Sequence, residues 1–424
     1  MKQPLLLNSN HEKQCNITYN LVFLYFTLNC AQELPTTAIY LILNDELNIQ
    51  PSTINEVYAL WYLPGLFRPI FGFISDRFPI YGYRRKPYLI LSVIFAIIWS
   101  IFLSIHTITF TQISFIMFGM LIYSAAAVAE TIADAMLIEL GNKYDDINIK
   151  NIKSKLQTQA MIVRCVASLV ASTLSIGLLT FCSTRLLIGL SCIFFVGGIV
   201  SVVIFSTEDS FSVSVQENSQ HLCSFRKWEL IQPLILIFIY YSIPNFEDTY
   251  DSYLADQFTF SDWQYSVFQF TDLLGSLLGA LFYWKFLSNR KLKFVFIISI
   301  LLSTLCNSMV FLLIARMVND LLFIPCFSFL TSFFNSISTI PPLILASLYI
   351  TKNNNFEGTI FSIFLMIIHL GSLVSSVISA QLTSALDITK TNWDQLWLFV
   401  LICLSCELLP LIGLWRGCAP SNPQ

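Results

Sequence analysis

The chain has 424 residues, of which 55% are hydrophobic and 12% are charged, and its mean hydropathy is +0.69. Soluble domains carry about 25% charged residues, so this composition excludes an ordinary water-facing surface and indicates a polytopic membrane protein. The formal net charge of −3 excludes a basic nucleic-acid-binding protein, so we expect a lipid bilayer and no nucleic acid among the partners.

Twelve apolar stretches reach the ~20 residues that cross a bilayer as a helix. They lie near residues 20–43, 53–75, 87–106, 110–139, 156–182, 185–206, 230–256, 263–287, 294–315, 319–350, 357–384 and 395–416. The fourth and the tenth are longer than a membrane requires, which indicates tilt, kinks or protruding ends. We therefore predict an all-α polytopic membrane protein with twelve transmembrane helices.

A polar interval after the sixth stretch separates the spans into two sets of six, and we predict that the chain has five parts. They are a cytoplasmic N-terminal segment (1–19), an N-terminal six-helix half (20–206), a cytoplasmic linker (207–229), a C-terminal six-helix half (230–416) and a cytoplasmic C-terminal tail (417–424). The N-terminal segment has no apolar core of signal-peptide length, so the first span is expected to act as its own insertion signal.

Lysine and arginine predict the orientation of these spans. If the N-terminus is cytoplasmic, 18 of the 23 lysines and arginines face the cytoplasm and three face outward, while Arg68 and Arg164 lie within spans. Cytoplasmic loops of membrane proteins carry such an excess. Both termini are therefore expected in the cytoplasm, with the plasma membrane as the default location over an organelle.

The two predicted halves share a faint pattern in their first spans. Each of these spans holds a proline, Pro35 or Pro244, and ends near an aspartate, Asp45 or Asp256, that follows Tyr-Leu. Proline weakens a helix, so Pro244 predicts a hinge in the seventh span. Parallel repeats of six spans build major facilitator transporters, so the pattern favours that fold.

The loop between the second and third spans gathers charge in an otherwise apolar region. It reads Gly72-x-x-x-Asp76-Arg77 and then Gly82-x-Arg84-Arg85-Lys86. Glycine permits close helix approach, and Asp76 is placed to pair with arginines or to face the N-terminus of a neighbouring helix. The spacing resembles the loop signature of the major facilitator superfamily.

The longer form of this loop, RPIFGFISDRFPIYGYRRKPYL, resembles the folate-biopterin transporter family. ADAMLIEL, KLQTQAMIVR and PPLILASLYITKNNNFEGTIFSIFLMIIHLGSLVSS resemble that family's fourth span, its fifth span and its tenth and eleventh spans. The resemblance extends from about residue 20 to 416. The chain departs from the family pattern at Gly65, where tryptophan is common, at Arg68, where lysine is common, and at Glu130, where aspartate is common. It also lacks the glycines expected after Arg164. Members of the family move folates, pterins and, in some cases, S-adenosylmethionine.

Ionisable residues inside spans usually face a cavity or a partner. Glu130 and Asp134 are four residues apart on one helical face, and Arg164 of the next span falls at a similar depth, so the three are expected together. One interpretation is a structural charge cluster in which they offset one another. The other is a site where substrate or a proton competes for Arg164, with Glu33 or Asp134 accepting from a pterin ring and Arg164 taking a carboxylate of a folate tail.

Further candidates lie in the C-terminal half. Glu247 and Asp248 follow Pro244 and are candidates for substrate binding or proton coupling, with the outer water layer as the alternative location. His369 is either a packing residue or a proton relay. Gly275 and Gly279 form a G-x-x-x-G that predicts close helix packing.

No phosphate loop, zinc-protease motif or nucleophile elbow is present, so we expect neither an enzyme nor an ATP-driven pump. The eleven cysteines lie largely in apolar runs and predict buried packing, with no metal and no cofactor. The sequence predicts a secondary carrier of folate or pterin compounds that works by alternating access with proton coupling. The alternatives are a carrier of another solute, such as S-adenosylmethionine, and a non-transporting receptor with the same fold.

Overall fold

The computed structural model describes residues 19–47, 57, 60, 61, 63–105, 111–145, 152–205, 227–257, 262–315, 323–348, 357–389 and 392–411. Nearly all of the predicted N-terminal segment, most of the predicted linker and the whole C-terminal tail lie outside these residues.

The described part of the chain is helical, and its extended pairings there are two isolated bridges, Ile80–Tyr83 and Thr389–Asn392. Eight described helices are long and apolar enough to cross a membrane, and two shorter apolar helices span Ile231–Tyr241 and Leu396–Leu411. The prediction of an all-α polytopic membrane protein is confirmed. The number twelve stays a prediction.

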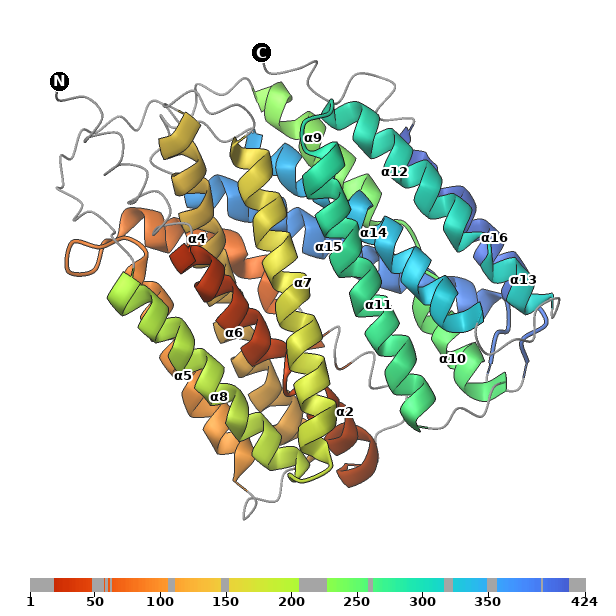
Figure 1. Ribbon diagram of the computed structural model, residues 1–424, viewed down its shortest axis with the longest axis horizontal. Helices are drawn as coiled ribbons and strands as arrows, with labels where there is room; N and C mark the ends of the chain where they lie inside the picture. Colours follow the sequence, from red (N-terminus) through yellow and green to blue (C-terminus); the bar gives the residue numbers. More distant parts are fainter. Residues whose placement is uncertain are drawn as a thin grey trace. The chain divides into compact units, whose positions relative to one another are not determined.

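The chain forms two compact units, and the first combines Met1–Ser219 with Ile350–Ile363. In unit 1, α5 packs against both α6 and α8 (Figure 1). Its helices are residues 19–33, α2 (Thr36–Leu41), α4 (Arg68–Arg77), α5 (Lys86–Ser104), α6 (Gln112–Asp145), α7 (Ile152–Leu179) and α8 (Thr184–Val200). The 34 residues of α6 extend about 50 Å, so this helix is longer than the ~30 Å apolar layer requires.

Two spans of unit 1 are interrupted. The first helix stops at a turn formed by Leu34 and Pro35 before α2 resumes the span. A 3₁₀ segment, Leu63–Phe67, precedes α4 and contains Pro64 and Gly65. Proline lacks the N–H that an α-helix needs, so both interruptions follow from the sequence.

Unit 2 combines Gln220–Tyr349 with Phe364–Gln424. The first seven residues of its helix α15 are therefore counted with unit 1. The helices are α9 (Lys227–Tyr241), α10 (Glu247–Gln257), α11 (Asp262–Phe282), α12 (Leu292–Asn307), α13 (Val310–Ile314), α14 (Phe323–Leu348), α15 (Glu357–Ala385) and α16 (Leu396–Glu407).

Helices α11 and α14 form the most extensive helix pair of unit 2. A Cβ atom added to Gly275 or Gly279 would collide with the backbone carbonyls of Phe329 and Phe333 on α14. Only glycine allows backbones to approach so closely. The prediction that this G-x-x-x-G packs helices is confirmed.

The seventh span is interrupted where the sequence predicts a hinge. Helix α9 ends at Tyr241, residues 242–246 are not helical, and α10 begins at Glu247. Asn245 caps the new helix, because its Oδ1 accepts from the backbone N–H of Glu247 at 3.0 Å. Asparagine is a favoured residue at such starts, so Pro244 and Asn245 together end one helix and begin the next.

Candidate functional site

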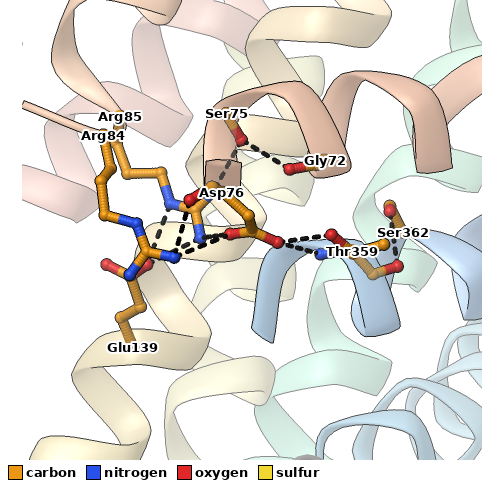
Figure 2. Close-up of polar contacts among 8 residues, drawn as sticks. All are labelled: Gly72, Ser75, Asp76, Arg84, Arg85, Glu139, Thr359 and Ser362. Atoms are coloured by element: carbon orange, nitrogen blue, oxygen red, sulfur yellow. Dashed lines mark hydrogen bonds and ion pairs between the residues drawn. The ribbon is translucent and has the colours of Figure 1, made fainter. Parts of the chain in front are cut away.

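The charged loop between α4 and α5 folds around one buried guanidinium, that of Arg85 (Figure 2). Its Nη2 donates to Asp76 at 2.6 Å and to Glu139 of α6 at 2.7 Å, and its Nη1 donates to Ser75 at 2.6 Å. Burial alone would lower the pKa of Arg85, but the carboxylates of Glu139 and Asp76 raise it above its usual value. Arg85 is therefore a fully charged centre that joins α4, α5 and α6.

Asp76 also contacts the start of α15. Its second oxygen, Oδ2, accepts from the backbone N–H of Thr359 at 2.7 Å and from the Thr359 hydroxyl at 2.5 Å (Figure 2). The first N–H groups of a helix have no partner within the helix and favour an acidic side chain. Asp76 thus makes both contacts that its position in the sequence predicts, with arginine and with a helix N-terminus.

Two glycines make this approach possible. A Cβ atom on Gly72 would lie 2.6 Å from Ser362 Oγ and 2.9 Å from the carbonyl oxygen of Gly358. A Cβ atom on Gly358 would lie 2.8 Å from the guanidinium nitrogens of Arg85. The close helix approach predicted for Gly72 is confirmed, and its partner is the first turn of α15.

The other residues of the loop signature lie around this centre. Gly82 has a φ of +79° at the tip of a tight turn closed by the Ile80–Tyr83 bridge, a conformation that favours glycine. Arg84 donates to the backbone oxygen of Asp76 at 3.1 Å. Arg77 is exposed and Lys86 is partly exposed, and they lie over the rings of Phe73 and Tyr83.

A second polar group lies within the predicted spans of unit 1. Arg164 of α7 donates to Asp134 of α6 at 2.7 Å, and the Tyr25 hydroxyl donates to the same carboxylate oxygen at 2.6 Å. The guanidinium of Arg164 also lies over the Tyr25 ring, 5.0 Å from its centroid. Asp134 and Tyr25 are buried, so together they hold Arg164 in one orientation.

The partner of Glu130 is not Arg164. Arg68, at the start of α4, donates to Glu130 at 2.5 Å, so the expected cluster of three residues contains a second arginine. Arg68 and Glu130 are two of the departures from the family pattern, and each bonds to the other. The amide of Gln32 also lies beside Glu130, and Nε of Arg68 is a buried donor without an acceptor among the described residues.

Glu33 is the third acid of this intramembrane group, which also contains Glu130, Asp134, Arg68 and Arg164. It differs from the other two acids in its partners. It lies directly before the turn at Leu34 and Pro35, and the Ser168 hydroxyl approaches its carboxylate. Among the described residues no arginine or lysine bonds to it, whereas Glu130 and Asp134 each bond to one. Three acids thus share two arginines in this group.

Arg164 keeps part of its hydrogen-bonding capacity. Its side chain is 28% exposed, and Nε and Nη1 donate to no described residue. A charged group inside a span avoids lipid and faces a partner or a water-filled opening. The exposed edge of Arg164 is therefore available to an acceptor that enters unit 1.

Of the three predicted residues of unit 2, the structure describes the side chains of Glu247 and His369. Glu247 is exposed at the start of α10 and bonds to Asn335 of α14 at 3.0 Å. The side chain of Asp248 lies outside what the structure describes. His369 is half-buried in the middle of α15, and its role stays a prediction.

Several partners in these sites escaped the sequence analysis. Tyr25, Gln32 and Ser168 lie in apolar helices where single polar residues are common, and Asn335 lies in a serine-rich stretch of α14. A signal was available for Arg68, since an arginine inside a span needs an acid near its own depth. Thr359 falls within a segment that resembles the family, but nothing local in the sequence links it to Asp76.

Comparisons with known proteins agree with these observations. A family model described as the BT1 family matches residues 29–415. The chain is 25% identical to folate transporter 2 of Plasmodium falciparum, over 96% of this chain and 90% of that protein. It is 23% identical to the folate-biopterin transporter of a Synechocystis species, over 88% of this chain and 76% of that protein.

The solved structure of the major facilitator superfamily proton:xylose symporter superposes with a TM-score of 0.68 and 12% identity, covering 96% of both chains. This likeness establishes the major facilitator fold, and the relatives are transporters and not enzymes, as expected. Because the family model spans most of its length, the chain belongs to the BT1 family and is a multi-pass membrane transporter.

Proposed function

We propose that the protein is a secondary active transporter that moves folate or pterin compounds by alternating access, driven by protons. The names of its relatives support the class of substrate. The observation that carries the proposal is the exposed edge of Arg164, held in place by Asp134 and Tyr25 inside a membrane-spanning unit.

The exposed edge of Arg164 suits an anionic substrate. A folate has a glutamate tail with carboxylates, and guanidinium and carboxylate pair through two parallel hydrogen bonds. Nη2 of Arg164 donates one of its two N–H groups to Asp134. Each paired-donor edge of a guanidinium includes Nη2, so its second N–H and that of one neighbouring nitrogen form the edge that can bind a carboxylate.

Alternating access requires contacts that break and re-form. The hydrogen bonds between Asp76 and Thr359 can break without leaving a buried charge unpaired. On the α15 side the donors are one backbone N–H and one hydroxyl. Breaking these bonds exposes no buried cation, because Arg85 keeps Asp76 and Glu139 as partners on its own side. The bonds of Arg85 to Asp76 and Glu139 then stay intact while the start of α15 separates from Asp76.

Charge balance in unit 1 supports a proton as the coupling ion. With two arginines and three acids, the intramembrane group is neutral only when one acid carries a proton. Glu33 is that acid, since Glu130 and Asp134 have arginine partners. A proton on Glu33 and a carboxylate on Arg164 would then travel in the same direction.

Replacing Glu33 with glutamine tests this coupling. Glutamine resembles protonated glutamate, so uptake of labelled folate should lose its dependence on pH. We expect wild-type uptake at about pH 5.5 to exceed that at about pH 7.5 several-fold, because the lower external pH increases the proton gradient that drives inward co-transport. The Glu33→Gln variant should take up folate equally at both values while still exchanging labelled for unlabelled folate.

The matched control is Glu46→Gln, which removes an acid that lies just after the same span. Glu46 bonds to Arg185 at 2.8 Å on the exposed surface of unit 1, so this variant should keep the wild-type response to pH. Accumulation by Glu33→Gln that still follows an imposed pH gradient would remove Glu33 from the coupling.

The cellular placement is part of the proposal. The distribution of lysine and arginine supports cytoplasmic termini, and we propose the plasma membrane as the location. The division into six-helix halves, 20–206 and 230–416, joined by the linker 207–229, follows from the spacing of the apolar stretches.

A further inference from the structure

The loop between α4 and α5 contains a tight hairpin with Tyr81 at its tip. Ile80 and Tyr83 exchange two backbone hydrogen bonds of 3.0 Å, so Tyr81 and Gly82 form a two-residue turn. Both central residues have positive φ, +52° for Tyr81 and +79° for Gly82, which is the pattern of a type I′ turn. Tyr81 is 94% exposed. The hairpin therefore displays an aromatic ring to its surroundings.

The local preferences of the turn do not explain Tyr81. Type I′ turns favour Asn-Gly or Asp-Gly, and Gly82 meets the second half of that preference. A bulky aromatic residue at positive φ is an outlier, because its Cβ crowds the backbone. Strained backbone of this kind is concentrated at functional positions. The conformation of Tyr81 therefore indicates a contact made by its side chain.

The helices on either side place the hairpin at the surface of the membrane. Helix α5 starts at Lys86 and is long and apolar enough to cross a membrane. Its exposed large side chains are apolar, as lipid contact requires, and they include Leu91, Ile94, Phe95 and Ile98. On α4, the exposed apolar residues Phe73 and Ile74 precede Arg77 by about one turn. The hairpin therefore lies just beyond the apolar layer, at the depth of the lipid headgroups.

Two cations flank the hairpin. Arg77 ends α4 and lies over the Phe73 ring, 5.9 Å from its centroid, and Lys86 begins α5 and lies over the Tyr83 ring at 5.2 Å. Arg77 is exposed and Lys86 is partly exposed, whereas Asp76, the acid of this stretch, is buried. The accessible surface of the loop is therefore positively charged, which attracts the anionic lipids of a membrane.

Hydrogen bonds hold the loop in this conformation. The Tyr88 hydroxyl of α5 donates to the backbone oxygen of Phe78 at 2.5 Å, and Arg84 donates to that of Asp76 at 3.1 Å. The side chain of Phe78 is exposed on the same loop as Tyr81. Aromatic rings and cations are therefore presented together before any ligand binds, which lowers the cost of ordering them on binding.

We propose that this hairpin binds an anionic phospholipid of the adjoining leaflet, with Arg77 and Lys86 on the headgroup and the rings of Phe78 and Tyr81 beside it. Basic side chains next to a span attract anionic lipids, and tyrosine rings favour the level of the headgroups. Asp76 directly precedes Arg77, so a bound lipid would steady the segment that contacts the start of α15. The proposal concerns a lipid and does not depend on which solute is transported.

Titration of the purified full-length protein in detergent with defined lipids tests the site. Native mass spectrometry measures the binding of dioleoylphosphatidylglycerol, which is anionic, and of dioleoylphosphatidylcholine, which is zwitterionic. We expect the wild-type protein to bind the anionic lipid several-fold more tightly. Combining Arg77→Gln with Lys86→Gln should weaken binding of the anionic lipid about tenfold or more and change that of the zwitterionic lipid less than about twofold.

Tyr81→Asn separates lipid binding from the stability of the loop. Asparagine suits this turn better than tyrosine does, so the variant without added lipid should unfold at the same temperature as the wild type or a higher one. Its affinity for the anionic lipid should nevertheless fall several-fold, because the ring at the headgroup level is lost. A variant that is as stable as the wild type and keeps full affinity would contradict the role of Tyr81.

The matched control is Lys285→Gln in unit 2. Lys285 is an exposed cation that lies over the Phe286 ring, 5.4 Å from its centroid, but it belongs to the helical segment Tyr283–Leu287 and not to a hairpin. This variant should bind the anionic lipid as the wild type does. An equal loss of affinity in Lys285→Gln and in the double variant would show that any surface cation attracts the lipid, and would overturn the site.

Soluble glycerol 1-phosphate distinguishes the membrane from a free phosphate ester as the source of the ligand. It should fail to displace the anionic lipid at an equal concentration, because it lacks the part that lies beside the aromatic rings. Displacement by glycerol 1-phosphate at that concentration would overturn the lipid as the ligand. None of these outcomes depends on folate uptake, so the proposed function is tested separately.

Discussion

Replacing Arg164 with alanine is expected to reduce folate uptake roughly a hundredfold or more, because truncating one member of a buried charge pair costs several kcal/mol. Uptake of labelled folate by cells that display the variant at their surface measures this effect. The loss has two physical sources. The substrate loses its carboxylate partner, and Asp134 is left buried with Tyr25 as its remaining donor among the described residues.

A double variant separates these two sources. Arg164→Ala combined with Asp134→Asn removes both charges, so the stranded carboxylate disappears and the protein should regain its stability against heat. Uptake should not return, because the guanidinium is still absent. Recovery of uptake in the double variant would show that the pair is structural and would contradict the role of Arg164 in substrate binding.

Replacing Asp76 with alanine should produce the second large effect. The buried guanidinium of Arg85 would keep Glu139 but lose its closest carboxylate, and breaking a buried pair costs about 3–5 kcal/mol. The bonds to Thr359 disappear as well, so the start of α15 would lose its contact with the loop. Thermal unfolding of the purified variant, together with folate uptake, measures both consequences.

Thr359→Val provides the matched control for Asp76. It removes one hydroxyl hydrogen bond, worth about 1 kcal/mol, while Arg85 keeps its full set of partners. We expect this variant to be nearly as stable as the wild type but to have an altered transport rate, since only the breakable contact is weakened. An Asp76→Ala variant that transports normally would mean that this contact plays no part in transport.

Much of the fold could be predicted because lipid leaves so few options. The apolar stretches, Pro35 and Pro244 in two of the interrupted spans, and the glycines between α11 and α14 each have one simple structural consequence in a membrane. The number of spans is harder to establish. Interruptions such as Leu34–Pro35 and residues 242–246 divide spans into helices shorter than a membrane requires.

The candidate site could be predicted only where its residues share a short stretch or adjacent helices. The spacing of Glu130 and Asp134, and the short connection from α6 to α7, predicted the contact with Arg164 correctly. The bond between Arg68 and Glu130 spans 62 positions and that between Asp76 and Thr359 spans 283. Helical periodicity cannot predict such contacts, because they depend on how the helices pack. In addition, the 3₁₀ segment before Arg68 changes the depth of Arg68 in the membrane.

Counterflow in proteoliposomes that contain only the purified protein tests the central claim most directly. Vesicles are loaded with unlabelled folate and diluted into a trace of labelled folate, so that accumulation of label requires a carrier that alternates between the two sides. We predict transient accumulation with folate or a pterin inside the vesicles, and none with S-adenosylmethionine or a sugar. Absence of accumulation with folate and pterin, or accumulation only with another solute, would contradict it.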